Sequence, residues 1–191
     1  TMGRAADIVL ELPRAREACP NGLAPTTSTL LQLALGDAIA IALLEDKGFS
    51  AHDFREFHPG GKLGAQLKLA RDIMHTGKSL PLVAAGTAMS EAIVEMSAKS
   101  FGCVGITGTG GLLAGIITDG DLRRHMGADL TSRSVDQIMT RAPKTIAPDM
   151  LAGEVIEMIN DARITSVFVV DGTGLPLGLV HIHDLLRMGV G

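Results

Sequence analysis

The sequence contains no Trp and no Tyr, and aromatic residues make up only 3% of its 191 positions. Proteins that bind single-stranded nucleic acid stack bases on aromatic side chains, and this chain has few of them. It also lacks an excess of basic residues, since its formal net charge is −4 at pH 7. Without that excess, the counterion release that drives binding to DNA or RNA is weak. We therefore expect no nucleic-acid partner.

Cysteines and long apolar segments are also scarce. Cys19 and Cys103 are far apart, and no Cys or His residues show the short spacing of a zinc site or a redox dithiol. We predict reduced thiols and a cytoplasmic location, and we assign no residue as a metal ligand, although the sequence leaves open whether a metal binds. The most apolar run, residues 30–44, contains Gln32 and Asp37 and is shorter than the roughly 20 residues that a membrane span requires. It predicts a buried helix and no membrane partner.

Residues 1–68 contain one predicted strand and one predicted long helix. Residues 6–12 form a short apolar run closed by Pro13, which is typical of a buried strand. A hydroxyl from residues 26–29 is expected to cap a helix that runs to about Asp46, although these residues are also suited to binding an anion at the helix start. One strand and one apolar helix cannot bury each other, so we expect this segment to be the end of a larger α/β domain.

The rest of the chain contains an internal repeat, which predicts two units at residues 69–128 and 132–191. Three blocks return in the same order 62 to 65 residues later. The first copies are DIM at 72–74, AIVEM at 92–96 and GIITDGDL at 115–122; the second are QIM at 137–139, EVIEM at 154–158 and GLVHIHDL at 178–185. Each copy predicts a helix (residues 89–100 or 151–162), two apolar strands joined by a Gly-rich turn, and a closing helix. One small unit closes a core poorly, so we expect the two to pack side by side.

The repeat resembles the CBS module, a β-α-β-β-α unit that works as a pseudo-symmetric pair. The matching pattern is Gly, two apolar residues, Thr, two variable residues, Asp and an apolar residue. It occurs at 115–122 and, with His181 in place of Thr, at 178–185. The resemblance implies an α/β fold with a tandem CBS pair related by pseudo-twofold symmetry.

The segment before the repeat resembles the end of the SIS sugar-isomerase domain of arabinose 5-phosphate isomerases. The resemblance is carried by EACPNGLAPTTST at 17–29, LGDA at 35–38, FHPGGKLG at 57–64 and HIHDLL at 181–186. These enzymes interconvert ribulose 5-phosphate and arabinose 5-phosphate on the way to Kdo, a lipopolysaccharide sugar. The resemblance implies that residues 1–68 are the C-terminal fragment of an SIS α/β sandwich. It also implies a homo-oligomer, with a CBS-mediated dimer and a tetramer in the complete enzyme.

The resemblance assigns one catalytic residue to this chain. His58 in the HPGG motif corresponds to a histidine implicated in the isomerase active site, and an imidazole suits proton transfer between adjacent carbons near neutral pH. From the residues alone, a His before Pro-Gly-Gly is equally suited to ending a helix. The family's phosphate loop, catalytic acids and lysine are expected to lie upstream of Thr1. We therefore expect no isomerase activity from this chain alone, and no catalytic cofactor.

In CBS pairs the Asp of the repeated pattern accepts hydrogen bonds from ribose hydroxyls, and the Thr lies near phosphate. The resemblance therefore implies a nucleotide-type effector at Thr118 and Asp121 in one unit and at His181 and Asp184 in the other. One carboxylate can accept both hydroxyls of a cis-diol. Alternatively, the two aspartates only cap the closing helices. Four cations are candidate anion contacts or plain surface charges: Arg123, Lys144, Arg163 and His183.

Two ligand classes and several alternatives for the whole protein stay open at the level of sequence. A His in place of Thr at 181 argues against a standard ATP or AMP pose, and feedback by the nucleotide sugar at the end of the pathway favours CMP-Kdo. The alternatives are a stand-alone CBS protein that binds adenine nucleotides, or a paralogous isomerase of sugar-alcohol or capsule metabolism. A dehydrogenase fused to CBS modules ranks last, because no G-x-G-x-x-G follows residues 6–12.

Overall fold

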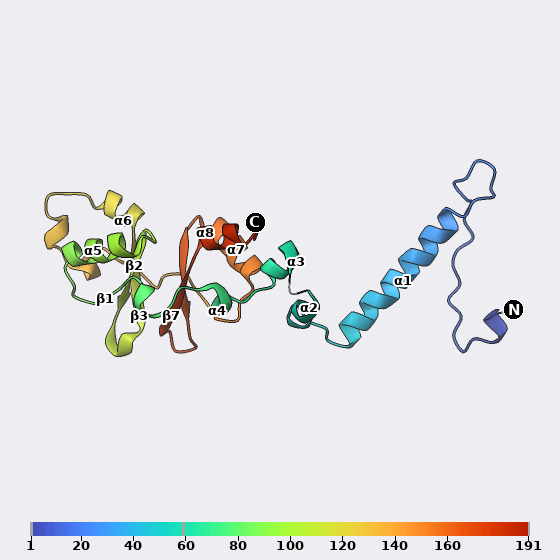
Figure 1. Cartoon of the computed structure of the whole chain (residues 1–191), viewed down its shortest axis with the longest axis horizontal. Coiled ribbons are helices and arrows are strands. Elements are labelled where there is room, and N and C mark those ends of the chain that lie inside the picture. The colour runs from blue at the N-terminus through green and yellow to red at the C-terminus, as the bar shows by residue number, and fades with distance from the viewer. Residues whose placement is uncertain (1, 59, 191) are drawn as a thin grey trace. The chain divides into compact units, whose positions relative to one another are not determined.

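A computed structural model describes residues 2–58 and 60–190, and the chain divides into two compact units, Thr1–Phe54 and Arg55–Gly191. Unit 1 contains a short 3-10 helix, η1 (Met2–Arg4), and the long helix α1 (Thr27–Asp46) (Figure 1). Helix α2 (Ala51–Phe57) crosses the division between the units. Each unit is described by itself below.

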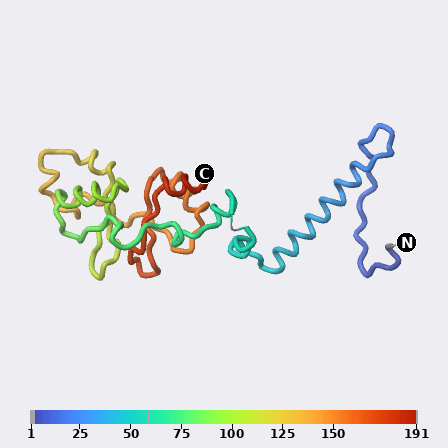
Figure 2. Tube along the Cα trace, in the orientation of Figure 1, coloured from blue at the N-terminus to red at the C-terminus, as the bar shows by residue number. Residues whose placement is uncertain are grey.

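The strand predicted at residues 6–12 is wrong. These residues form neither helix nor strand (Figure 2), and Ile8, Val9 and Leu10 are exposed. A strand needs hydrogen bonds to a neighbouring strand, and the described residues of unit 1 contain no other strand. An apolar run alone is not enough to form this element.

The predicted long helix is confirmed, but its predicted burial is wrong. No residue of α1 is buried, and Leu30, Leu33 and Ile41 are each at least 60% exposed. The apolar side chains of α1 itself point to all sides of the helix and are not confined to one face. This pattern suits a helix that is enclosed by other elements. The described residues of unit 1 provide no such elements. With 20 residues, α1 is also long and apolar enough to cross a membrane, which is weak evidence because core helices of soluble proteins pass the same test.

Glu17, and not a hydroxyl group, caps the start of α1. Its Oε2 atom accepts hydrogen bonds from Thr26 N at 2.8 Å, Thr26 Oγ1 at 2.9 Å and Ser28 N at 3.3 Å. Hydrogen bonds from the Ser28 side chain and then from Thr26 lower the pKa of Glu17 to about 2. An internal carboxylate thus takes the place where the sequence allowed an external anion.

Unit 2 contains two copies of one supersecondary pattern, repeat 1 (69–128) and repeat 2 (132–191). In repeat 1 the elements are β1 (Leu82–Ala84), α5 (Met89–Lys99), β2 (Cys103–Thr107), β3 (Leu113–Thr118) and α6 (Asp119–Arg124). In repeat 2 they are β5 (Thr145–Ile146), α7 (Ala152–Ala162), β6 (Ser166–Val170), β7 (Pro176–His181) and α8 (Ile182–Arg187). The predicted helices and hairpins are therefore confirmed. The short connecting elements are α3 (Gly61–Gln66), α4 (Ala70–Ile73), η2 (Gly77–Ser79), η3 (Thr109–Gly111), η4 (Leu130–Ser132), η5 (Val135–Gln137) and β4 (Thr140–Arg141).

The strands form two sheets with the orders β1-β2-β3-β4 and β5-β6-β7. In both repeats the first strand runs parallel to the second, and the next two form an antiparallel hairpin. Each hairpin has a register irregularity, between Ile106 and Thr107 in one and between Val169 and Val170 in the other. These positions are equivalent in the repeat, so the two copies agree in backbone detail as well as in sequence.

Each repeat sends its first residues, here called its lead-in (69–76 or 134–141), to the hairpin of the other repeat. β4 belongs to the lead-in of repeat 2 and pairs with β3 of repeat 1. His75 in the lead-in of repeat 1 exchanges backbone hydrogen bonds of 2.8 and 3.0 Å with Leu179 of β7. The side chain of Met139 lies over Gly115 and that of Met74 over Gly178, where a Cβ atom would overlap the methionine. The lead-ins are therefore exchanged between the repeats.

This exchange determines the composition of the two main cores. The core under α5, β2 and β3 also contains buried residues from the segment that leads into repeat 2: Leu130, Val135, Ile138 and Met139. The core under α7, β6, β7 and α8 also contains Ala65 and Ala70, with Ile73 and Met74 packed against it. Neither core is built from one repeat alone.

A third apolar cluster, formed by Leu80, Cys103, Phe168 and Leu179, joins the two hairpins. Phe168 of β6 is fully buried, and its equivalent in β2 is Gly105. A Cβ atom at Gly105 would lie 2.7 Å from Phe168 Cζ. The large and the small residue at equivalent positions thus face each other, and the pair breaks the symmetry of the repeats.

Candidate functional site: the equivalent aspartates of the two repeats

Asp121 holds the start of α6. Thr118 is the N-cap residue of this helix and Asp121 stands three positions later, which is the arrangement of a capping box. Asp121 Oδ2 accepts hydrogen bonds from Thr118 N at 2.8 Å and Thr118 Oγ1 at 2.7 Å, and Oδ1 accepts one from Arg124 Nη2. Burial by itself would raise the pKa of Asp121, but these hydrogen bonds and the Arg124 charge outweigh it, so the pKa is lowered. Any ligand at Asp121 has to compete with this cap.

Asp184, the equivalent residue of repeat 2, contacts a lead-in instead. Its Oδ2 atom lies 2.8 Å from His75 Nε2, and because a carboxylate only accepts, His75 donates from this nitrogen. Arg187 Nη1 lies 4.0 Å from Asp184 Oδ1, which is beyond hydrogen-bond distance. The N-cap residue of α8 is His181, whose Nδ1 accepts a hydrogen bond from His183 N at 3.2 Å. The Asp184 side chain is 25% exposed, against 5% for Asp121.

Aromatic rings surround the contact between His75 and Asp184. Phe101, from the loop between α5 and β2, has its ring centre 4.7 Å from that of His75 and 6.0 Å from that of His181. The rings of His181 and His183 are 5.0 Å apart. Ser166 Oγ, at the start of β6, donates a 3.0 Å hydrogen bond to Phe101 O and so ties this loop of repeat 1 to repeat 2. We call this group the histidine cluster: His75, Phe101, His181, His183 and Asp184.

The electrostatics favour a neutral imidazole at His181. Burial lowers its pKa, the neighbouring His183 lowers it further, and Asp184 acts in the opposite direction. His183 is exposed in the first turn of α8. An imidazole N–H donates hydrogen bonds whether or not the ring is charged. The histidine cluster therefore places nitrogen donors and flat rings beside one accessible carboxylate.

The remaining candidate residues lie at the surface. Arg123 is on α6, Lys144 precedes β5, and Arg163 is the left-handed C-cap of α7. Among the described residues, the side chains of these three have no hydrogen bond or ion pair. His58 follows α2, and its N–H group donates to Arg55 O at 3.2 Å, as in a residue that ends a helix. Pro59 of the HPGG motif lies outside the described residues, and the roles of all these side chains stay predictions.

Sequence reasoning missed His75 and Phe101. One signal for His75 was present, because it directly follows the first DIM block, as Thr140 follows the QIM block of repeat 2. The spacing of the repeat does not tell which hairpin a lead-in reaches, so the contact with Asp184 was not predictable from it. Phe101 lies in a loop outside the matched blocks.

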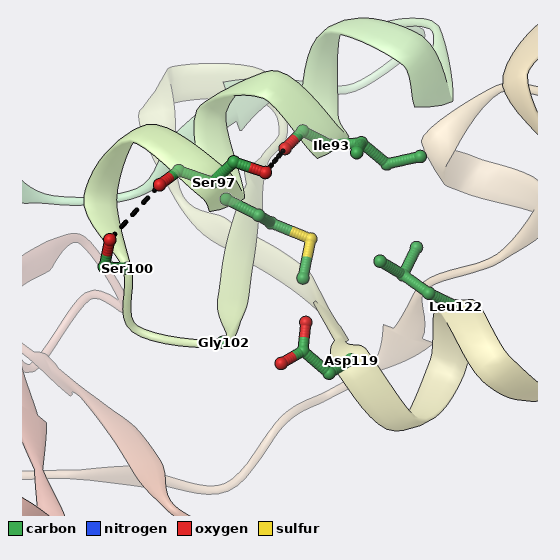
Figure 3. A pocket seen from close by; sticks show the side chains of 7 residues that line it. Ile93, Ser97, Ser100, Gly102, Asp119 and Leu122 are labelled. Carbon is green, nitrogen blue, oxygen red and sulfur yellow. Dashed lines mark hydrogen bonds between the residues drawn. The ribbon is translucent and has the colours of Figure 1, made fainter.

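Two surface pockets lie outside the histidine cluster. One, of about 320 Å³, lies between α5 and α6, where Asp119 and Leu122 face Ile93 and Ser97 (Figure 3). The other, of about 470 Å³, lies between α7 and the chain at Gln66. Neither is lined by Asp121 or Asp184. Within residues 2–58 and 60–190, no three His, Cys, Asp or Glu side chains are grouped so that they could hold a metal ion.

Comparison with known proteins identifies the fold of unit 2. The model of the CBS domain family matches residues 70–128 and 135–191, more than half of the chain. The chain belongs to the CBS domain family. Among solved structures, it is similar to the CBS domain pair of protein MJ0100 in complex with 5′-methylthioadenosine and S-adenosyl-L-methionine. The two share 25% sequence identity and a TM-score of 0.56 over 63% of this chain and 94% of the other. The predicted tandem CBS pair is confirmed.

The similarity to known proteins extends beyond the CBS pair. Arabinose 5-phosphate isomerase KdsD of Pseudomonas aeruginosa is 46% identical over 192 residues, which are 99% of this chain and 59% of that protein. The enzyme of the same name from Escherichia coli is 46% identical over 193 residues, 100% of this chain and 58% of that protein. The predicted resemblance to these isomerases is confirmed. The chain spans less than two thirds of the length of either relative.

Proposed function

We propose that this chain is the C-terminal, regulatory part of a D-arabinose 5-phosphate isomerase, which interconverts ribulose 5-phosphate and arabinose 5-phosphate for the biosynthesis of Kdo. The observation that carries the proposal is the 46% identity over 99 to 100% of the chain, because it includes unit 1 as well as the CBS pair. A stand-alone CBS protein would share only the pair with these isomerases. The second alternative is a paralogous isomerase of sugar-alcohol or capsule metabolism. It would differ from the proposed enzyme in the pathway that it serves and in its substrate.

The exposure of α1 supports a larger catalytic domain. An apolar helix without covering elements fits the interior of an SIS α/β sandwich, whose other strands and helices would come from the part of the relatives that this chain does not span. Residues 6–12 would then have neighbouring strands to pair with. Asp37 in the middle of α1 favours this over a membrane, because a charged residue at the centre of a span costs about 2.5 to 3.5 kcal/mol.

His58 is the catalytic residue that we assign to this chain. A histidine that transfers a proton during isomerisation contributes about 10²- to 10⁴-fold to the rate. The test uses the complete isomerase that contains this sequence, its His58→Ala and His52→Ala variants, and this chain alone. We expect His58→Ala to lose at least about 100-fold in kcat, His52→Ala to keep its rate, and this chain to give background conversion of arabinose 5-phosphate. Turnover by this chain alone would contradict the proposal that the other catalytic residues lie in the part of the relatives that this chain does not span.

The CBS pair binds a nucleotide-type effector. Support comes from the complex of the 25% identical MJ0100 pair with two adenosine derivatives, and from the accessible Asp184 carboxylate beside the rings of the histidine cluster. Feedback on a committed step favours the nucleotide sugar CMP-Kdo as the effector, with adenine nucleotides as the alternative. A coupling of about 1 to 3 kcal/mol between effector and active site would change activity roughly 5- to 150-fold.

A thermal-shift screen of this chain with ATP, AMP, CMP and CMP-Kdo separates these ligands. A ligand that binds only the folded state adds RT ln(1 + [L]/Kd) to the free energy of unfolding, about 2.7 kcal/mol at 100 times Kd. Stabilisation by the cytidine compounds alone would support product feedback. Stabilisation by adenine nucleotides alone would favour an energy-sensing module, and no shift at millimolar concentration would refute the effector.

The same proposal includes a homo-oligomer, with dimers formed through the CBS pair and a tetramer in the complete isomerase. Light scattering after size exclusion measures both masses. A monomeric chain at tens of micromolar would contradict a CBS-mediated dimer.

A further inference from the structure

We infer that the chain binds one ribonucleotide and not two, at Asp184 and the histidine cluster, while Thr118 and Asp121 serve only to cap α6. This inference rests on the proposed nucleotide binding and specifies its place and stoichiometry. It follows from a comparison of two positions that the repeat makes equivalent. The pseudo-twofold symmetry predicts two equal sites, whereas the contacts of the two aspartates differ.

The two positions are equivalent in backbone and in sequence. Asp121 and Asp184 both stand at the third position of a short closing helix, after Thr118 and His181 as N-cap residues. The lead-in partners are also equivalent, because Thr140 pairs with Ile116 on β3 and His75 pairs with Leu179 on β7. A difference between the sites therefore comes from side chains and not from topology.

Both oxygens of the Asp121 carboxylate already accept hydrogen bonds from the protein, and one of these bonds belongs to the capping box. Oδ2 accepts two hydrogen bonds from Thr118, and Oδ1 accepts one from Arg124. The Thr118 hydroxyl in turn accepts a hydrogen bond from Asp121 N at 3.3 Å. Asp121 is only 3% exposed, so a sugar would have to break the capping box before it could reach the carboxylate.

The Asp184 carboxylate is available. Thr118 donates a hydrogen bond to Asp121, but His181 Nδ1 cannot donate one to Asp184, because it accepts a hydrogen bond from His183 N. Asp184 Oδ2 accepts one hydrogen bond from His75, and Oδ1 has only the distant Arg187, whose side chain is 81% exposed. One oxygen can therefore accept a ribose hydroxyl at once, and the second can be shared when the half-buried His75 ring moves.

The surroundings of Asp184 suit the other parts of a ribonucleotide. The rings of Phe101 and His181 offer flat faces for a base, and His183 and Arg187 are exposed donors for a phosphate. The repeat spacing puts residues without these properties around Asp121: Gly120 for His183, Thr140 for His75, Ile164 for Phe101, and an Arg124 that is already bound to Asp121. Only one of the two positions therefore combines rings, donors and an accessible carboxylate.

Calorimetric titration of this chain with AMP and with CMP tests the inference, with Asp184→Asn and Asp121→Asn as a matched pair of variants. We expect a stoichiometry of about one ligand per chain. Loss of a charged hydrogen-bond acceptor should weaken binding about tenfold or more in Asp184→Asn. Asp121→Asn should stay within about twofold, provided that circular dichroism confirms its fold. The 2′,3′-dideoxy forms of both nucleotides complete the design.

The dideoxy ligands distinguish a contact with the ribose from a general loss of structure. They should bind the wild-type chain about tenfold more weakly than the ribonucleotides, and they should bind Asp184→Asn as well as the ribonucleotides do. Two ligands per chain, or a larger loss in folded Asp121→Asn than in Asp184→Asn, would overturn the inference but leave nucleotide binding in place. If Asp121→Asn does not fold, the wild-type stoichiometry decides. No heat with either ribonucleotide at millimolar concentration would refute the inference, whereas the proposed effector fails only if CMP-Kdo also gives no thermal shift.

Discussion

Replacing Gly115 by Ala places a Cβ atom within the volume of Met139. Before any relaxation this atom would lie 2.9 Å from Met139 Cγ and 3.1 Å from Met139 Cβ, whereas carbon atoms pack at about 3.5 to 4.0 Å. Overpacking of a core costs about 1 to 3 kcal/mol of stability. In a strand, a Gly to Ala change without such a clash would instead stabilise by about 0.5 to 1 kcal/mol. The sign of the effect therefore reports on Met139.

A second substitution removes the two closest atoms of Met139, Sδ and Cγ. Met139→Ala eliminates the Cγ and Sδ atoms and, because Met139 is only 9% exposed, should by itself cost about 2 to 5 kcal/mol. We expect the variant with both changes to be about as stable as Met139→Ala alone, which is a coupling of about 1 to 3 kcal/mol. The control combines Gly115→Ala with Met74→Ala, which lies over Gly178 in the other core. The effects of this control pair should add within about 0.5 kcal/mol.

Urea unfolding followed by far-ultraviolet circular dichroism gives the free energy of unfolding for each variant. Intrinsic fluorescence is unsuitable because the chain has no Trp and no Tyr. If the effects of the Gly115 and Met139 changes were as additive as those of the control pair, the packing of the repeat 2 lead-in on the repeat 1 hairpin would be refuted.

Three further predictions concern the core of unit 2, the reactivity of the two cysteines, and the pH dependence of the Asp121 cap. Phe168→Ala removes a fully buried ring from between the hairpins and should cost about 3 to 5 kcal/mol in the same unfolding experiment, whereas Leu186→Ala at an exposed position should cost little. Burial raises the pKa of Cys103 to about 11, while backbone N–H groups of Ala24, Leu23 and Asn21 lower that of Cys19. Iodoacetamide at pH 8 should therefore modify Cys19 first, as peptide mass spectrometry can measure. The pKa of Asp121 is lower in the folded state, so its stabilisation is present above the unfolded pKa of about 3.9 and is lost as the pH falls through the folded value. The stability difference between wild type and Asp121→Asn should then narrow below about pH 4 in acid titrations followed by circular dichroism; a constant difference would contradict it.

Local pattern predicted most of unit 2. The helices α5 and α7 have apolar residues at helical spacing, and the hairpins have glycines where the turn requires them, such as Gly110 with a φ of 71°. The internal repeat then doubled each signal, because both copies had to form the same elements. These features depend on residues close together in the chain, which a sequence displays directly.

Features that depend on distant residues were not predictable in this way. The cap of α1 comes from Glu17, nine residues before Thr26, where a Thr or Ser near the helix start was the simpler expectation. The burial of α1 and the strand at residues 6–12 both require neighbours that the described residues do not supply. In the candidate site, the two aspartates were identified from the repeated pattern. His75 was missed because its partner is 109 residues away.

The exchange of lead-ins also constrains how the CBS pair folds during synthesis and which parts of its gene can be separated. As the chain leaves the ribosome, the core under α5 stays incomplete until Val135, Ile138 and Met139 have followed. The core under α7 uses Ala65 and Ala70, which emerge long before the rest of it. A gene cut between the repeats would leave both cores short of buried residues and two methionine-sized gaps over Gly115 and Gly178. Evolution can therefore duplicate, move or lose this pair as one piece, but it cannot readily keep half of it.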